Sequence, residues 1–135
     1  MYQSLAHTKW CCKYHVVIVP KYRRKVLYGK YRREIGKIIR ELCEYKGIEI
    51  IKAHSCIDHI HMCISIAPKY KVSDVMAYIK GKSALRLFDK FPELKNKVNG
   101  KKLWTRGYFV STVGLDIERI KKYIEFQESY EKNMD

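Results

Sequence analysis

Two histidines flank an isoleucine at His59-Ile60-His61, in a stretch where apolar residues alternate with polar ones. Because side chains alternate across a β-strand, both imidazoles should project from one face while Ile60 and Met62 enter the core. Two imidazoles about 6–7 Å apart on a rigid support can share one metal ion. The pattern is short, and two ordinary surface histidines would produce it as well. The pair predicts a metal site if other residues complete it.

Tyr123 and Gln127 are four residues apart in a segment with helical spacing, so they should share a helix face. A glutamine amide oxygen is a hard donor that can complete a two-histidine site for Mg²⁺ or Mn²⁺. A tyrosine phenol, with a free pKa of about 10, is a weak nucleophile unless a metal polarises the phosphate that it attacks. Tyr123 could also simply pack. Tyr130 lies on nearly the same face, but Gln127 is one turn beyond Tyr123, which favours Tyr123.

The charge of the chain indicates a polyanionic partner. Lys and Arg total 28 against 14 Asp and Glu, a net charge of +14. The basic residues cluster with aromatic residues among them, as in Lys21-Tyr22-Arg23-Arg24-Lys25 and Lys30-Tyr31-Arg32-Arg33. Such rings can stack on unpaired bases while the cations contact phosphates. The pattern therefore favours binding to single-stranded nucleic acid over a merely solubilising surface.

The hydrophobic pattern predicts the elements that would position these residues. Strands are expected over 14–20, 48–55, 57–66 and 104–113, the last with a bulge or bend at Gly107. Three helices are expected. The first should end near Gly47, the second should begin at an N-cap Ser73, and the third should begin at an N-cap Asp116 after a break in the chain at Gly114. Residues 93–102 are expected to form a loop. This order predicts an α+β, ferredoxin-like or RRM-like fold: an antiparallel four-stranded sheet with helices on one face, plus a C-terminal helix carrying Tyr123.

Length and composition restrict the class of protein further. The 135 residues suffice for one domain over 1–135. We expect a soluble cytoplasmic protein, because no apolar run is long enough to span a membrane and the N-terminus lacks the features of a signal peptide. The five cysteines form no CxxC pair and are expected to be reduced thiols. The sequence contains no P-loop motif for binding a nucleotide.

Several segments together resemble one family over nearly the whole chain, the single-tyrosine HUH transposases of the smallest bacterial and archaeal insertion sequences. His59-Ile60-His61, preceded by Asp58, is similar to the His-hydrophobe-His motif of that family. Tyr123-Ile124-Glu125-Phe126-Gln127 matches its Tyr-x-x-x-Gln pattern. Two further segments resemble its second helix and its strand before the nucleophile helix: Tyr78-Ile79-Lys80-Gly81-Lys82-Ser83 and Trp104-Thr105-Arg106-Gly107-Tyr108-Phe109-Val110-Ser111. Met62 and Cys63 replace the more usual aliphatic residues.

The resemblance implies roles for these residues. His59, His61 and Gln127 would be the ligands of Mg²⁺ or Mn²⁺, and Tyr123 would attack the phosphate to form a 5′-phosphotyrosine link. The partner would be single-stranded DNA with hairpins near the ends of the element. The protein would act as a homodimer in which the helix of one subunit can complete the site of the other. The basic residues expected to contact DNA are Lys21, Arg23, Arg24, Lys80, Lys82 and Arg106.

Other functions remain open at this point. A non-catalytic RRM-like module would bind nucleic acid on the same fold, but it would leave the His-His and Tyr-Gln pairs as coincidences. Replication initiators and relaxases share the chemistry but are usually larger than this chain. A repeat-associated HUH endonuclease would share both the chemistry and the size.

Overall fold

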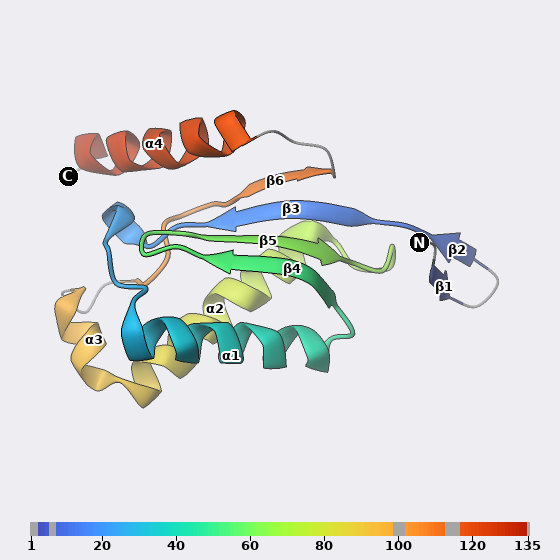
Figure 1. The fold of residues 1–135 in the computed structure, drawn as a ribbon, viewed down its shortest axis with the longest axis horizontal. Coiled ribbons are helices and arrows are strands. Elements are labelled where there is room, and N and C mark those ends of the chain that lie inside the picture. The colour runs from blue at the N-terminus through green and yellow to red at the C-terminus, as the bar shows by residue number, and fades with distance from the viewer. Residues whose placement is uncertain (1–2, 6–7, 99–101, 113–116, 135) are drawn as a thin grey trace.

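An antiparallel sheet with strand order β4-β5-β3-β6 forms the centre of the computed structural model, which describes residues 3–5, 8–98, 102–112 and 117–134 (Figure 1). The strands are β3 (Lys13–Ile18), β4 (Glu49–Ser55), β5 (Ile60–Ser65) and β6 (Phe109–Thr112). Every pairing between them is antiparallel. The predicted α+β fold is therefore confirmed, with β4 and β6 as the two edges of the sheet.

Helices α1 (Gly29–Tyr45) and α2 (Val72–Lys90) cover one face of this sheet (Figure 1). The alternation along β5 is as expected, since Ile60, Met62 and Ile64 are buried in the core shared with both helices. Helix α1 ends where the sequence predicted, with Gly47 beyond it at a φ of +70°. A left-handed glycine at this position is a common helix stop because it lacks a Cβ.

Helix α4 (Ile117–Met134) lies across the opposite face of the sheet, above β3 and β6 (Figure 1). Its Ile124 forms a second small core with Val17 and Val19, against which Phe109 and Tyr123 pack. The face that α1 and α2 leave open is therefore partly covered by the helix that carries Tyr123.

Three local expectations were wrong. Residues 93–102 are not simply a loop, because α3 (Pro92–Lys97) begins with a proline at its first turn and buries Leu94 completely. Helix α2 begins at Val72 after Lys71, so Ser73 is not its N-cap. The last strand begins at Phe109 instead of Trp104, since Gly107 bends the chain at a φ of +82° and Trp104 forms only an isolated bridge to Pro20. The expected break at Gly114 and cap at Asp116 lie outside the described residues.

Some short elements were not expected from the sequence. The strands β1 (Gln3–Leu5) and β2 (Thr8–Trp10) pair with each other in a separate antiparallel ribbon. A single 3₁₀ turn, η1 (Lys21–Arg23), follows β3. Within the described ranges, no helix combines the length and the apolar character needed to cross a membrane.

Candidate functional site

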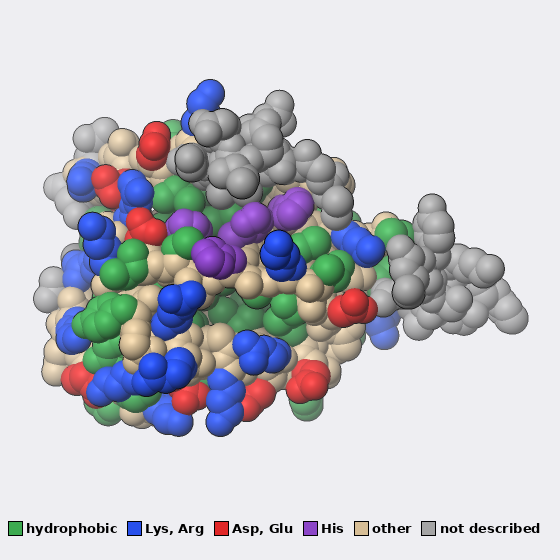
Figure 2. Space-filling view, viewed as in Figure 1, with side chains coloured by type: hydrophobic (Ala, Val, Ile, Leu, Met, Phe, Trp, Pro, Cys, Tyr) green, Lys and Arg blue, Asp and Glu red, His purple; other side chains and the backbone are tan. Residues whose placement is uncertain are grey.

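Histidines from three neighbouring strands gather on the sheet face opposite α1 and α2. His54 of β4 is paired directly with His61 of β5, and His15 of β3 places its Nδ1 atom 3.0 Å from Nε2 of His61. The sequence predicted His59 to lie within this strand, but β5 begins at Ile60 and His59 lies one residue before it. Figure 2 shows histidine side chains in one patch on the surface. Spacing predicted His59 and His61, but His15 and His54 approach through strand pairing, which the sequence alone does not reveal.

A carboxylate orients the ring of His59. Its Nδ1 atom lies 2.9 Å from Oδ1 of Asp58, whose other oxygen accepts a hydrogen bond of 2.8 Å from Nε of Arg23. Burial disfavours the charged carboxylate, but the hydrogen bonds from His59 and Arg23 outweigh it and hold the pKa of Asp58 below its usual value. Because a carboxylate accepts hydrogen bonds, this contact assigns the proton of an uncharged ring to Nδ1, so that Nε2 is the nitrogen that could bind a ligand.

The environment of His61 favours the neutral ring. Burial lowers the pKa of His61, and the neighbouring His15, His59, His54 and Lys52 lower it further. A metal binds the neutral form of an imidazole, so a depressed pKa reduces competition from protons. His61 could therefore serve as a metal ligand near neutral pH, and a metal ion at its Nε2 atom would replace the 3.0 Å contact with His15.

Tyr123 and Gln127 contact each other directly on one face of α4. Nε2 of Gln127 donates a hydrogen bond of 3.1 Å to the Tyr123 oxygen, and the Thr105 hydroxyl donates one of 3.3 Å to Oε1 of Gln127. Burial raises the pKa of Tyr123, the negative charge of Glu131 adds to this, and the Gln127 hydrogen bond opposes it. Tyr130 is half exposed instead and stacks on Phe126. The structure therefore gives Tyr123, and not Tyr130, a defined polar partner.

Both predicted pairs lie on the same face of the sheet. Val17 of β3 pairs with His61 across the strands and also packs with Tyr123 in the small core under α4. The hydrogen bonds described for Gln127 go to Tyr123 and Thr105, and those of the histidines go to Asp58 and His15. Val17 thus adjoins both His61 and Tyr123 on this face, while within the described residues no hydrogen bond joins the histidines to Tyr123 or Gln127.

Acidic residues of α4 engage the basic turn η1. Glu131, whose side chain is 3% exposed, accepts a hydrogen bond of 2.9 Å from the Tyr22 backbone N–H and forms an ion pair of 3.2 Å with Lys21. Arg23 lies 3.3 Å from Glu128 while also bound to Asp58. Two of the residues expected to contact DNA, Lys21 and Arg23, therefore have partners within the protein.

The other residues expected to contact DNA differ in their surroundings. The Lys80 ammonium donates to the carbonyls of Thr105 and Gly107 at 2.8 and 2.6 Å, and burial lowers its pKa. Arg24 donates to the Lys97 carbonyl, whereas Lys82 and Arg106 are exposed. Lys80 thus holds the bend before β6 in place. Contact of these residues with DNA stays a prediction.

The two segments that contain Lys80 and Trp104 meet in the core. The indole N–H of Trp104 donates a hydrogen bond of 3.0 Å to the hydroxyl of Ser83, and both side chains are buried. A buried polar group that lacked a partner would be costly. Trp104 and Ser83, which belong to the two segments that resemble the transposase family, therefore have a structural role in the core.

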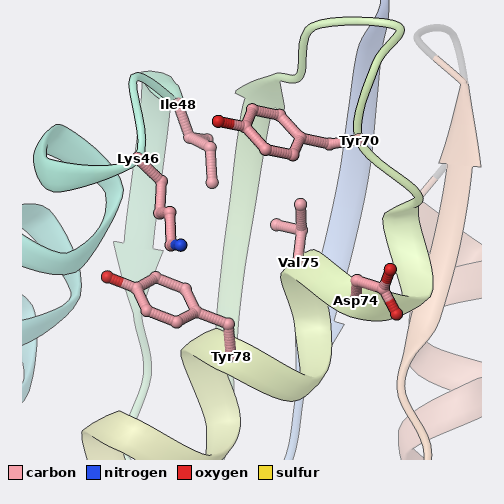
Figure 3. A pocket seen from close by; sticks show the side chains of 6 residues that line it. All are labelled: Lys46, Ile48, Tyr70, Asp74, Val75 and Tyr78. Atoms are coloured by element: carbon pink, nitrogen blue, oxygen red, sulfur yellow. The ribbon is translucent and has the colours of Figure 1, made fainter.

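An apolar cavity lies on the other side of the sheet (Figure 3). It has a volume of about 110 Å³ and is formed where α1 ends, β4 begins and α2 begins. Its walls are Lys46, Ile48, Tyr70, Asp74, Val75 and Tyr78. The Lys46 ammonium lies 5.2 Å from the centre of the Tyr78 ring, whose hydroxyl donates to the Leu42 carbonyl. This cavity is separated from the histidines by the sheet.

The fold and the grouping of these side chains agree with the class expected from the sequence, a DNA transposase of small insertion sequences. A family model described as "Transposase IS200 like" matches residues 8–127. The chain belongs to this IS200-like transposase family.

Two similar relatives are transposases by name. The transposase for insertion sequence element IS200 of Salmonella typhimurium is 51% identical over 125 residues, which are 93% of this chain and 82% of that protein. The ISDra2 transposase TnpA of Deinococcus radiodurans is 35% identical over 120 residues, 88% of this chain and 86% of the relative.

Solved structures agree with the fold. A crystal structure of a protein assigned as a transposase from Deinococcus radiodurans superposes with a TM-score of 0.85 at 30% identity, covering 94% of this chain and 98% of that one. The REP-associated tyrosine transposase bound to a REP hairpin gives a TM-score of 0.57 at 11% identity over 93% of this chain and 70% of the other. The second likeness supports the fold alone.

Proposed function

We propose that the protein cuts and rejoins single-stranded DNA, with Tyr123 as the nucleophile and a divalent metal ion held by His59, His61 and Gln127. One observation carries this proposal: the Asp58-oriented His59 and its neighbour His61 share a sheet face with the hydrogen-bonded Tyr123–Gln127 pair. Membership in the IS200-like transposase family supports it. Neighbouring residues hold these side chains in place: Asp58 holds His59, and Thr105 holds Gln127.

The donor set suits Mg²⁺ or Mn²⁺. Among the described residues, no cluster of three or more His, Cys, Asp and Glu side chains could hold a metal ion. In this proposal the Gln127 oxygen completes the two imidazoles, and such a set leaves positions for phosphate oxygens. When bound, the ion would polarise the phosphate that is attacked. Asp58 and Thr105 would orient the ligands His59 and Gln127.

The reaction exchanges one phosphoester for another. The Tyr123 phenol gives up its proton to solvent as its oxygen forms a bond to phosphorus, the bond to the leaving 3′ oxygen breaks, and that oxygen takes up a proton. The strand then ends as a 5′-phosphotyrosine and a free 3′-hydroxyl. A 3′-hydroxyl later attacks the same phosphorus, which restores the phosphodiester and releases Tyr123. The N–H group of Gln127 stabilises negative charge on the phenol oxygen. Because the number of ester bonds is conserved, no nucleotide cofactor is consumed.

The substrate that fits best is single-stranded DNA with hairpins at the ends of an insertion sequence. The net charge of +14 suits a polyanion, and the relatives named above are transposases of insertion sequences. A protein with the same fold is bound to a REP hairpin in its solved structure, which supports the proposal of a hairpin ligand. The 51% identity to an insertion-sequence transposase favours insertion-sequence ends as the substrate over the substrate of a repeat-associated enzyme.

We further propose a homodimer in which α4 of one subunit can complete the site of the other.

The first test identifies the nucleophile. Tyr123→Phe keeps the ring that packs on Phe109 but removes the oxygen, so the covalent protein–DNA adduct should disappear while the fold and DNA binding persist. Tyr130→Phe is the matched control and should still form the adduct. The adduct is measured by gel shift after incubation with Mg²⁺ and single-stranded DNA from the flanks of the gene. Adduct formation by Tyr123→Phe would exclude this residue.

The second test concerns the metal. The double change His59→Ala/His61→Ala should abolish cleavage, because both imidazole ligands are gone. Binding to single-stranded DNA should remain, since it depends on basic residues elsewhere. Cleavage that persists in this variant in the presence of Mg²⁺ or Mn²⁺ would contradict the proposed ligands. Failure of the native protein to form any adduct would instead favour a non-catalytic nucleic-acid-binding module.

A further inference from the structure

A groove of about 370 Å³ runs between α1 and the edge strand β4. Its floor combines small residues with buried apolar ones: Gly36, Ala53, Ser55, Ile39, Ile60 and Met62. Arg32, Arg33 and Arg40 line it from the side of α1. Figure 2 shows Lys and Arg side chains gathered along α1, in the same view that shows the histidine patch beyond the sheet. The groove thus has an apolar floor and a cationic rim.

The two sides of α1 differ in how their charges are compensated. Toward α2, Glu34 pairs with Lys90 at 2.7 Å and Glu41 pairs with Arg86 at 3.6 Å. The three groove arginines, in contrast, are exposed and form no ion pair with any described residue. Guanidinium groups without acidic partners can bind phosphates through paired hydrogen bonds.

Gly36 supports the presence of a ligand in this groove. It lies in the middle of α1, where glycine is among the least favourable residues. A Cβ atom added there would meet only Nη2 of Arg40 at 3.8 Å, so packing within the chain does not require glycine. Arg32 and Arg40 lie one turn to either side of it. The missing side chain leaves the helix backbone accessible between the two arginines.

We propose that this groove binds a segment of single-stranded DNA, with the three arginines on its phosphates and a sugar or base on the apolar floor. Arg32 and Arg40 are about 12 Å apart along the helix axis, so the two guanidinium groups would contact different phosphates of one strand. A cationic groove with apolar surface is the usual design for binding unpaired strands. The proposal rests on the proposed function in one respect, that the substrate is DNA.

The test compares two triple variants with equal loss of charge. Arg32→Gln/Arg33→Gln/Arg40→Gln removes the groove cations, whereas Lys30→Gln/Arg86→Gln/Lys90→Gln removes three cations that already have acidic partners. Affinity for a fluorescent single-stranded oligonucleotide is measured against salt without metal. The log–log slope should decrease by about 2 for the groove variant, at roughly 0.7 per phosphate contact. The control should change little; equal slopes in the two variants would overturn the proposal.

A second variant leaves the charge unchanged. Gly36→Leu should fill the groove between the arginines and weaken DNA binding at least several-fold. Its thermal midpoint should not fall, since the added side chain has space and leucine favours a helix. Unchanged affinity in this variant would also overturn the proposal.

Failure of the groove proposal can be distinguished from failure of the proposed catalytic function, because DNA binding is measured without metal and without cleavage. A native protein that binds through the groove but forms no adduct would refute the catalytic proposal and leave the groove intact. A groove variant with native affinity and salt dependence would refute the groove and leave catalysis intact. If the groove variant lost affinity for duplex DNA or RNA but not for single-stranded DNA, the assigned ligand would be wrong.

Discussion

Two basic regions of this protein differ in what their cations do. In η1, Lys21 and Arg23 contact Glu131, Glu128 and Asp58 within the chain. On α1, Arg32, Arg33 and Arg40 line a groove and pair with no described acidic residue. Both regions appear in the sequence as similar clusters of basic and aromatic residues. The first region supports the docking of α4, whereas the second has its charge available for a ligand.

This difference shows that net charge does not identify which cations can meet a phosphate. An arginine that already has two carboxylate partners must lose them before it can bind DNA, so its contribution to affinity is reduced. An unpaired arginine at the surface has no such competition. The comparison can be tested by removing acids or cations from each region and measuring stability and DNA affinity separately.

The largest effect is expected for Glu131→Ala. This change leaves the Tyr22 N–H and the Lys21 ammonium without the carboxylate, in a position where Glu131 is 3% exposed. Loss of hydrogen bonds to a charged group of this kind costs about 2 kcal/mol of unfolding free energy. Urea unfolding would measure the loss, with the exposed Glu125→Ala on the same helix as control. Equal losses in the two variants would mean that Glu131 does not hold α4.

A smaller effect should separate Arg23 from Arg33. Arg23→Gln loses its contacts with Asp58 and Glu128 and should destabilise the fold by about 1 kcal/mol, with little change in the salt dependence of DNA binding. Arg33→Gln should leave stability within about 0.5 kcal/mol and reduce the salt slope by about 0.7. Thermal unfolding and DNA titration check the two halves. A stability loss in Arg33→Gln together with a lower salt slope in Arg23→Gln would contradict the difference between the two regions.

The smallest effect concerns the individual pair of Arg23 and Glu128. Both side chains are about one-third exposed, so solvent screens their attraction. A double-mutant cycle with Arg23→Gln and Glu128→Gln should give a coupling of about 0.5 kcal/mol in unfolding free energy. A coupling of zero would mean that Arg23 stabilises the fold through Asp58 and not through Glu128.

Much of the fold could be predicted because periodicity reports burial directly. Alternation along β5 and the spacing of Ile35, Ile38 and Leu42 on α1 both matched the core. Helix α3 was missed because its six residues carry too little periodicity, so that the burial of Leu94 could not be read from the sequence. The bend expected at Gly107 is present, but it ends the pairing so completely that β6 begins only at Phe109 and not at Trp104.

The candidate site was predictable only in its local parts. His59 with His61, and Tyr123 with Gln127, are each close in sequence, and their spacing follows from strand and helix geometry. The contacts of His61 with His15 and of Arg23 with Glu128 join residues far apart in the chain. Such contacts depend on strand register and on where α4 docks, which no local pattern specifies.

The conformation of η1 affects how firmly α4 is held. Tyr22 and Arg23 have φ values of 61° and 52°, a left-handed conformation that costs a residue with a Cβ about 1–2 kcal/mol. Glu131 stabilises this turn by accepting the Tyr22 N–H. If α4 leaves the sheet, the turn can relax to an ordinary backbone conformation and recover that energy. The docked helix is therefore held less tightly than its ion pairs alone indicate, and in the homodimer proposed above this would lower the cost of moving α4 from one site to the other.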